Sequence, residues 1–189
     1  MPKCQIKNNI CMAIDKIHNV FPSIKINEYV TEIKEDEKLN SIAQTDKGII
    51  SIRGNINQAS VNEYLNDRSD FKYYKDNEDF PKDLETNLEY RVSPKNTDNP
   101  TGLLLHEIGH SLSKGNKSFY DNFVTYLQKN TLYFDNYKTK ILPKELSVQA
   151  IYYKNELFAD AFADYIMNGK KASHVGKLIP EFLKEQGII

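Results

Sequence analysis

His106, Glu107 and His110 form the sequence HEIGH, in which two histidines stand four residues apart with a glutamate directly after the first. On an α-helix, residues at this spacing share one face and lie about 6 Å apart, so both imidazoles can reach one Zn²⁺ ion at about 2.0–2.1 Å. Glu107 is turned about 100° from His106, too far round the helix to be a ligand. Its carboxylate can still take a proton from a metal-bound water. The pattern therefore predicts a metal centre with Glu107 as general base.

A third metal ligand is expected from the later segment Asn155–Tyr165, whose sequence is NELFADAFADY. On a helix, Glu156 and Asp160 share one face, and the alanines beside them would let this helix approach the first one closely. Glu156 would then complete the metal site, and Asp160 would accept a hydrogen bond from a ligating imidazole. Three protein ligands leave one position for water, as in catalytic zinc sites. Other carboxylates lack this combination of neighbours: Asp121, Glu145 and Asp164.

Both motifs need rigid elements to hold them, and the second half of the chain predicts helices. Asn99 followed by Pro100 predicts a capped helix start. Apolar residues opposite the histidines would anchor this helix in the core: Leu104, Leu105, Ile108 and Leu112. Gly109, beside the ligand pair, would keep that side of the helix open. Helices are expected over residues 100–114, 117–130, 144–168 and 171–186.

The first half of the chain predicts a helix and a small sheet. Apolar residues at helical spacing predict a helix over Asn8–Val20. Alternating patterns predict strands within residues 24–30 and 39–45, and Gly48–Gly54 is the strongest strand sequence because it is β-branched and bounded by glycines. Residues 23–54 would form a small, mostly antiparallel sheet. Asn57 would cap a helix through Asp67, and the polar, tyrosine-rich stretch after it predicts a loop with a strand at Leu88–Ser93.

This order of elements predicts an α+β fold. We expect a single domain, in which residues 1–99 form a helix-and-sheet part and residues 100–189 form a helical part that carries the metal site. With 189 residues, 40% of them hydrophobic and 27% charged, the chain is typical of a soluble globular protein and can bury a substantial core.

Composition also excludes several classes of function. The chain has 25 Lys+Arg against 26 Asp+Glu, so its net charge of −1 gives no reason to expect nucleic acid or an anionic membrane as partner. No apolar run is long enough to span a membrane. Cys4 and Cys11 are too few for a thiolate zinc site. The first ten residues lack the apolar stretch of a secretory signal, which leaves the compartment open.

HEIGH followed by NELFADAF in a later helix resembles the gluzincin metallopeptidases. The closest likeness is to the anthrax-lethal-factor-like group, whose bacterial members include Pro-Pro endopeptidases and toxin catalytic domains. The resemblance implies a zincin-like fold and a zinc endopeptidase that acts on peptides or proteins, secreted or delivered if toxin-like. It implies one Zn²⁺ per chain, held by His106, His110 and Glu156. Glu107 would be the general base for a metal-activated water, and Asp160 the partner carboxylate.

One feature of this group has no direct counterpart here. The group carries a tyrosine two helical turns before the third ligand, which stabilises the oxyanion, and Gln149 stands at that position in this chain. Tyr152 and Tyr153, one turn before the third ligand, are the candidate catalytic substitutes, and His174 is another. The peptide itself would lie extended against an edge strand. Gly48–Gly54 is the first candidate for that edge, and Leu88–Ser93 is the second.

Two other functions are compatible with these residues. A cytoplasmic regulatory HExxH peptidase would share the reaction but act on a different substrate. A non-enzymatic binding or structural module would use the metal only to join two helices. Such a module predicts a closed metal site, and it leaves Glu107 without a role. The sequence leaves the substrate sequence and the oligomeric state open.

Overall fold

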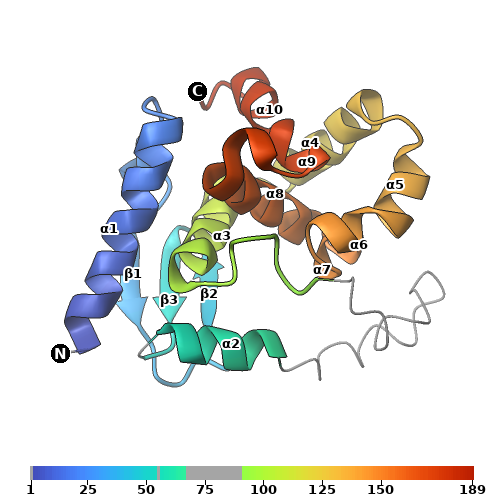
Figure 1. Ribbon diagram of the computed structural model, residues 1–189. Coiled ribbons are helices and arrows are strands. Elements are labelled where there is room, and N and C mark those ends of the chain that lie inside the picture. Colours follow the sequence, from blue (N-terminus) through green and yellow to red (C-terminus); the bar gives the residue numbers. More distant parts are fainter. Residues whose placement is uncertain (1, 55, 67–90) are drawn as a thin grey trace.

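The computed structural model describes residues 2–54, 56–66 and 91–189 (Figure 1). In chain order its elements are α1 (Pro2–Val20), β1 (Glu32–Glu35), β2 (Ala43–Asp46), β3 (Ile49–Ile52), α2 (Gln58–Asn66), α3 (Pro100–Leu112), α4 (Lys117–Asn130), α5 (Phe134–Lys140), α6 (Leu142–Glu145), α7 (Gln149–Tyr152), α8 (Lys154–Asn168), α9 (His174–Lys177) and α10 (Ile179–Glu185). The expected α+β class is confirmed, with helices dominant. Figure 1 shows α3 in the middle, between α1 and the sheet on one side and the later helices on the other. None of the described helices combines the length and hydropathy needed to cross a lipid bilayer.

The sheet is small and mixed, with the strand order β1-β3-β2. Lys47 and Gly48 join β2 to β3 with φ angles of 48° and 81°, the left-handed pair of a tight two-residue hairpin. This turn makes β2 and β3 antiparallel, whereas β1 pairs with β3 in parallel. The expectation of a mostly antiparallel sheet is therefore met by only one of the two strand pairs. The strand expected at Gly48–Gly54 is present as β3, but it is the central strand and not an edge. Among the described strands, β2 is the edge that faces α3.

The prediction of a strand within residues 24–30 is wrong. The chain forms a 3₁₀ turn at Ile26–Glu28, because the backbone N–H groups of Tyr29 and Val30 both donate to the Ile26 carbonyl. Phe21 and Ile24 are buried, so the apolar spacing here reflects a chain entering the core as α1 ends. β1 (Glu32–Glu35) was not expected, since its sequence EIKE holds a single apolar residue and its side chains are largely exposed.

The helix expected over residues 144–168 is broken into α6, α7 and α8. The backbone leaves the helix after α6 because Arg91 N–H donates to the Pro143 carbonyl and Val148 N–H donates to the Arg91 carbonyl. Tyr153 is extended, with φ −118° and ψ 116°, and separates α7 from α8. The helix expected over residues 171–186 is likewise divided into α9 and α10.

Some expectations fall wholly or partly outside the described residues. Of the strand expected at Leu88–Ser93, only residues 91–93 are described, and they are not in a strand. The end of the helix expected through Asp67 and the tyrosine-rich stretch up to residue 90 lie outside the described residues. The start of that helix agrees with the expectation, because the Asn57 side chain accepts a hydrogen bond from Ser60 N–H at 3.0 Å.

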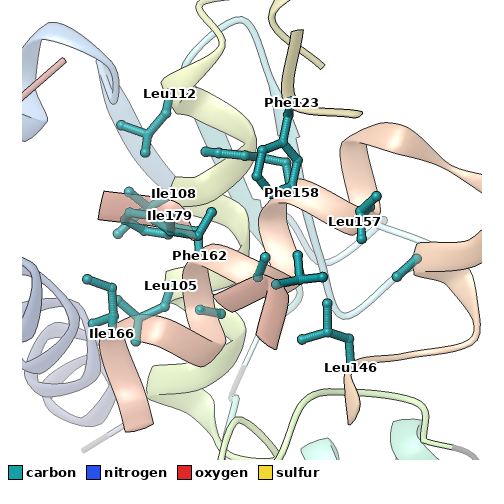
Figure 2. Close-up of a cluster of buried hydrophobic side chains, with 14 of the residues drawn as sticks. Leu105, Ile108, Leu112, Phe123, Leu146, Leu157, Phe158, Phe162, Ile166 and Ile179 are labelled. Carbon is teal, nitrogen blue, oxygen red and sulfur yellow. The ribbon is translucent and has the colours of Figure 1, made fainter. Parts of the chain in front are cut away.

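The core lies mainly between α3 and α8. Figure 2 shows buried side chains of the two helices gathered together, namely Leu105, Ile108, Leu112, Leu157, Phe158, Phe162 and Ile166. Burying each large apolar side chain stabilises the fold by about 1.5–3 kcal/mol. Gly109 lies at the closest approach of the helices: a Cβ atom there would be 3.0 Å from the Cα atom of Ala159. Gly109 therefore does not keep a side of α3 open, as the sequence suggested, but allows α8 to pack directly against it.

Candidate metal centre

Helix α3 starts as the sequence predicts and carries both histidines. The Asn99 side chain accepts a hydrogen bond from Gly102 N–H at 2.9 Å, and Pro100 occupies the first turn. Gly102 is required here, because a Cβ atom would lie 2.3 Å from the Thr97 carbonyl oxygen. His106 and His110, one turn apart, place their ring centroids 4.7 Å from each other at nearly a right angle. The capped start and the packed apolar face fix the direction in which both rings project.

Helix α8 brings the Glu156 carboxylate to the two imidazoles. His106 Nε2 lies 3.0 Å from His110 Nε2 and 3.1 Å from Glu156 Oε2, and His110 Nε2 lies 3.4 Å from Glu156 Oε1. In a tetrahedral zinc site with bonds of about 2.0–2.2 Å, neighbouring ligand atoms are about 3.3–3.6 Å apart. The observed separations agree with this edge length to within a few tenths of an ångström. Among the described residues, these three form the group whose donor atoms converge as metal ligands do.

Asp160 orients one of the imidazoles. Its Oδ1 lies 2.8 Å from His106 Nδ1, and its Oδ2 accepts a hydrogen bond from the Ser147 hydroxyl. Ser147 in turn accepts from Ala150 N–H at 3.2 Å. Because a carboxylate accepts, His106 Nδ1 carries a proton, and Nε2 is the ring nitrogen that is left to bind a metal. This is the arrangement by which buried carboxylates set the tautomer of a metal-binding histidine.

Glu156 and His106 influence each other electrostatically. Burial by itself lowers the pKa of His106, but hydrogen bonds to Asp160 and Glu156 outweigh it and raise that pKa well above 6.5. Burial raises the pKa of Glu156, but hydrogen bonds with His106 and His110 outweigh it and lower that pKa well below 4.5. Asn155 also donates to Glu156 Oε1 at 2.8 Å. Glu156 therefore stays ionised, as a carboxylate ligand must, whereas a metal has to displace a proton from His106.

Glu107 is held by the sheet rather than by its own helix. The Thr45 hydroxyl, on β2, lies 2.7 Å from Glu107 Oε2 and 3.0 Å from the Glu107 carbonyl oxygen. Only 6% of Glu107 is exposed. This contact fixes one carboxylate oxygen and links the edge strand directly to the residue expected to act as the base.

The histidines and Glu107 lie in the wall of a groove of about 790 Å³. The whole of β2 lines it, together with the exposed face of α3 and with Gln149, Asn155 and Glu156 from the other side. Tyr120 of α4 also lines the groove, and its hydroxyl donates to the His110 carbonyl at 3.2 Å or to Ser113 Oγ at 3.0 Å. Burial, more than the nearby Glu156 charge, raises the pKa of Tyr120, so its phenol keeps its proton.

The candidate tyrosines from the sequence lie elsewhere. Neither Tyr152 nor Tyr153 belongs to the groove wall, and Tyr153 is half-exposed at the start of α8. His174 is also away from the groove, with its Nε2 3.1 Å from Thr131 Oγ1. Gln149, at the position of the missing family tyrosine, does line the groove.

The alternative third ligands are engaged at other places. Glu145 accepts a hydrogen bond from the Tyr137 hydroxyl at 2.6 Å. Asp164 accepts from Ser173 N–H and from the Asn168 amide, each at 2.7 Å. Asp121 forms an exposed ion pair with Lys154.

Sequence reasoning did not identify several residues that support the site: Thr45, Ser147, Tyr120 and Asn155. Thr45 stands 62 residues before the glutamate it contacts, and Ser147 stands 13 residues before Asp160. No periodicity links such positions. Asn155 is the exception, because it directly precedes Glu156 in the sequence and could have been found by inspecting the neighbours of that predicted metal ligand.

Comparisons with models of known protein families, with characterised proteins and with solved structures give no match to this chain. The functional argument therefore depends on the geometry of the site.

Proposed function

We propose that this protein is a zinc-dependent endopeptidase with a zincin-like fold. The observation that carries the proposal is the convergence of His106, His110 and Glu156 at tetrahedral spacing, with the Glu107 carboxylate beside them in an open groove. Two imidazoles and one carboxylate are a ligand set of catalytic zinc sites. The order of elements supports the resemblance to the lethal-factor-like group, because a helix and a small sheet precede the HExxH helix and a later helix carries the third ligand.

A zinc ion held by these residues would polarise a peptide carbonyl and lower the pKa of a bound water towards about 7. Glu107 accepts the proton of the attacking water at its carboxylate and delivers it to the leaving amine. The hydrogen bond from Thr45 holds Glu107 Oε2 at 2.7 Å, which leaves Oε1 to exchange the proton. Asp160 keeps His106 in the tautomer that can bind the metal.

One edge of β2 pairs with no strand of the described residues, and this edge would supply a binding surface for an extended peptide. Arg53 N–H donates to the Ile42 carbonyl, and antiparallel hydrogen-bonded pairs alternate along the ladder. The backbone groups of Ala43 and Thr45 therefore point away from β3, towards the groove. Main-chain pairing with β2 gives affinity without requiring a particular sequence. In our proposal the peptide therefore pairs with β2, and not with the central strand β3 that the sequence suggested.

A hydrogen-bond donor is needed where negative charge develops on the carbonyl oxygen. Tyr152 and Tyr153 stay as the sequence-based prediction for that donor. Tyr120 is the stronger candidate in our proposal, since it lines the groove and its protonated hydroxyl lies 3.2 Å from the His110 carbonyl oxygen.

The two alternative functions are less well supported. A structural module predicts a metal enclosed by protein ligands, but three donors converge here beside a groove of about 790 Å³. A structural metal site that only joins two helices would also give the buried Glu107 carboxylate no role. A regulatory HExxH peptidase would use the same site geometry and differ in its substrate.

The test is zinc analysis combined with peptide cleavage in the presence and absence of a chelator. We expect one zinc per chain and cleavage that stops when zinc is removed. Glu107→Gln should keep the zinc and lose about three or more orders of magnitude in rate. Glu145→Gln, which changes a carboxylate outside the groove, is the matched control and should keep both zinc and activity. Full cleavage by Glu107→Gln would contradict the proposal.

A further inference from the structure

The groove has a basic end. Lys47, in the turn between β2 and β3, and Lys117, at the start of α4, both line it. The two segments lie close together: a Cβ atom at Gly48 would be 2.6 Å from the Tyr29 carbonyl oxygen, and the Nζ of Lys114 lies 4.4 Å from the Tyr29 ring centroid. The β2–β3 turn and the loop after α3 thus form one wall beyond His110, and this wall is rich in lysine.

Lysine occupies backbone positions here that favour glycine or asparagine. Lys47 has φ 48° and Lys114 has φ 49°, both in the left-handed region. A side chain with a Cβ atom is disfavoured at such positions. The side chain of Lys114 covers the Tyr29 ring. Lys47 is exposed and lines the groove.

The carboxylates of the groove are mostly engaged by other groups. Glu156 contacts both histidines, Asp160 contacts His106 and Ser147, and Glu107 accepts from Thr45. Asp46 is the acidic residue that lines the basic end. Within the described part of the chain, no ion pair is formed by Lys47 or Lys117. Lys47 and Lys117 thus outnumber Asp46 among the charged residues of the groove wall at this end.

The opposite end of the groove is apolar. Its apolar residues are Ile42, which directly precedes β2, and Leu103, which lies in the first turn of α3. Thr45, which contacts Glu107, stands between the two ends of the β2 wall. The groove therefore changes from apolar to basic along the direction of β2, with the metal ligands in between.

We propose that the groove selects peptides with an acidic side chain on one side of the scissile bond and an apolar side chain on the other. This inference rests on the proposed peptidase function and names its substrate class. Lys47 directly follows Asp46, the last residue of β2, which lies about 3.4 Å beyond Thr45 along the strand. A peptide paired with β2 therefore brings its acidic residue within one or two positions of the bond opposite Glu107. Lys47 and Lys117 are the specificity-determining residues.

The first experiment uses peptides that are acetylated and amidated at their ends and carry Glu, Gln or Lys at each position near the cleaved bond. We expect the Glu peptides to be cleaved about tenfold better in kcat/KM than the Gln peptides, and the difference to shrink with added salt. Peptides with a free C-terminal carboxylate form a separate arm. A gain that requires this terminal carboxylate, and not the Glu side chain, would overturn the proposal.

Charge-reversal variants assign the preference to residues. Lys47→Glu and Lys117→Glu should each reduce the preference for Glu over Gln, measured as the ratio of kcat/KM values, by about three- to tenfold. Lys34→Glu makes the same charge change on the exposed strand β1, at the other edge of the sheet, and should leave the preference unchanged. Equal losses for Glu and Gln peptides in the two groove variants would contradict the assignment.

Binding to zinc-loaded Glu107→Gln protein separates this inference from the proposed function. Fluorescence anisotropy with the same labelled peptides needs no hydrolysis. If no peptide is cleaved by the native protein but Glu peptides bind more tightly than Gln peptides, the groove inference holds and the peptidase proposal fails. If peptides are cleaved with no preference for Glu, the peptidase proposal holds and the groove inference fails. Equal binding of Glu and Gln peptides also overturns the groove inference.

Discussion

The contact between Asp160 and His106 allows the metal centre to be tested without any assumption about a substrate. Asp160→Asn keeps the shape of the side chain. Its carbonyl oxygen can still accept from His106 Nδ1, and its amide can donate to Ser147 Oγ, where the native carboxylate accepts. The substitution therefore removes one buried negative charge, on a side chain that is 5% exposed, and leaves the packing in place.

The expected loss follows from the type of interaction. A hydrogen bond to a charged partner contributes about 1.5–3 kcal/mol, against about 1 kcal/mol for a neutral one. Changes to a carboxylate behind a metal-binding histidine typically weaken metal binding about 10–100-fold, which corresponds to about 1.4–2.8 kcal/mol. We expect the zinc Kd of Asp160→Asn to rise within this range, as measured by competition with a chromophoric chelator.

Asp164 provides a matched control on the same helix, one turn further along. It is equally buried and accepts hydrogen bonds from Ser173 and Asn168, away from the metal ligands. Asp164→Asn should change the free energy of unfolding without changing the zinc Kd. Equal zinc affinity of Asp160→Asn and the native protein, or an equal loss in both variants, would refute the orienting role of Asp160.

Three further predictions follow from the same contacts. Thr45→Val should lower the cleavage rate about 10–100-fold with the zinc Kd unchanged, since it removes a hydrogen bond to the Glu107 carboxylate; Thr45→Ser should restore the rate, and an unaltered rate in the valine variant would exclude this positioning role. Gly109→Val should destabilise the protein by about 1–3 kcal/mol in urea unfolding and weaken zinc binding, because the added atoms push α8 away at Ala159. In zinc-free protein, the raised pKa of His106 means that the protonated imidazole stabilises the fold fully below its ordinary value of 6.5, and this stability is lost as the pH rises through the raised pKa. The urea midpoint of zinc-free protein should therefore fall as the pH rises above the ordinary histidine pKa of 6.5, and a midpoint that rises with pH there would contradict the assignment.

The sheet was less predictable than the helices, and the reasons are local. Apolar and polar residues alternate over residues 24–30 as they would in a strand. The backbone N–H groups there donate to carbonyls only a few residues away, in turns, and the apolar side chains enter the core beside α1. β1 has almost no apolar content, and its place beside β3 is set by pairing with a distant strand. Likewise, the break between α6 and α7 depends on backbone hydrogen bonds with Arg91, more than fifty positions earlier.

The sequence by itself determined the helix start at Asn99, the shared face of His106 and His110, and the capacity of α8 to present Glu156 and Asp160 on one side. These are properties of helical periodicity and capping, which act over a few residues and can be derived from neighbouring positions. Tertiary structure alone decided that Thr45 contacts Glu107, that Ser147 supports Asp160, and that β2 is the strand beside the metal ligands. Such contacts join segments far apart in the chain, and their geometry is fixed only when the core between α3 and α8 is packed.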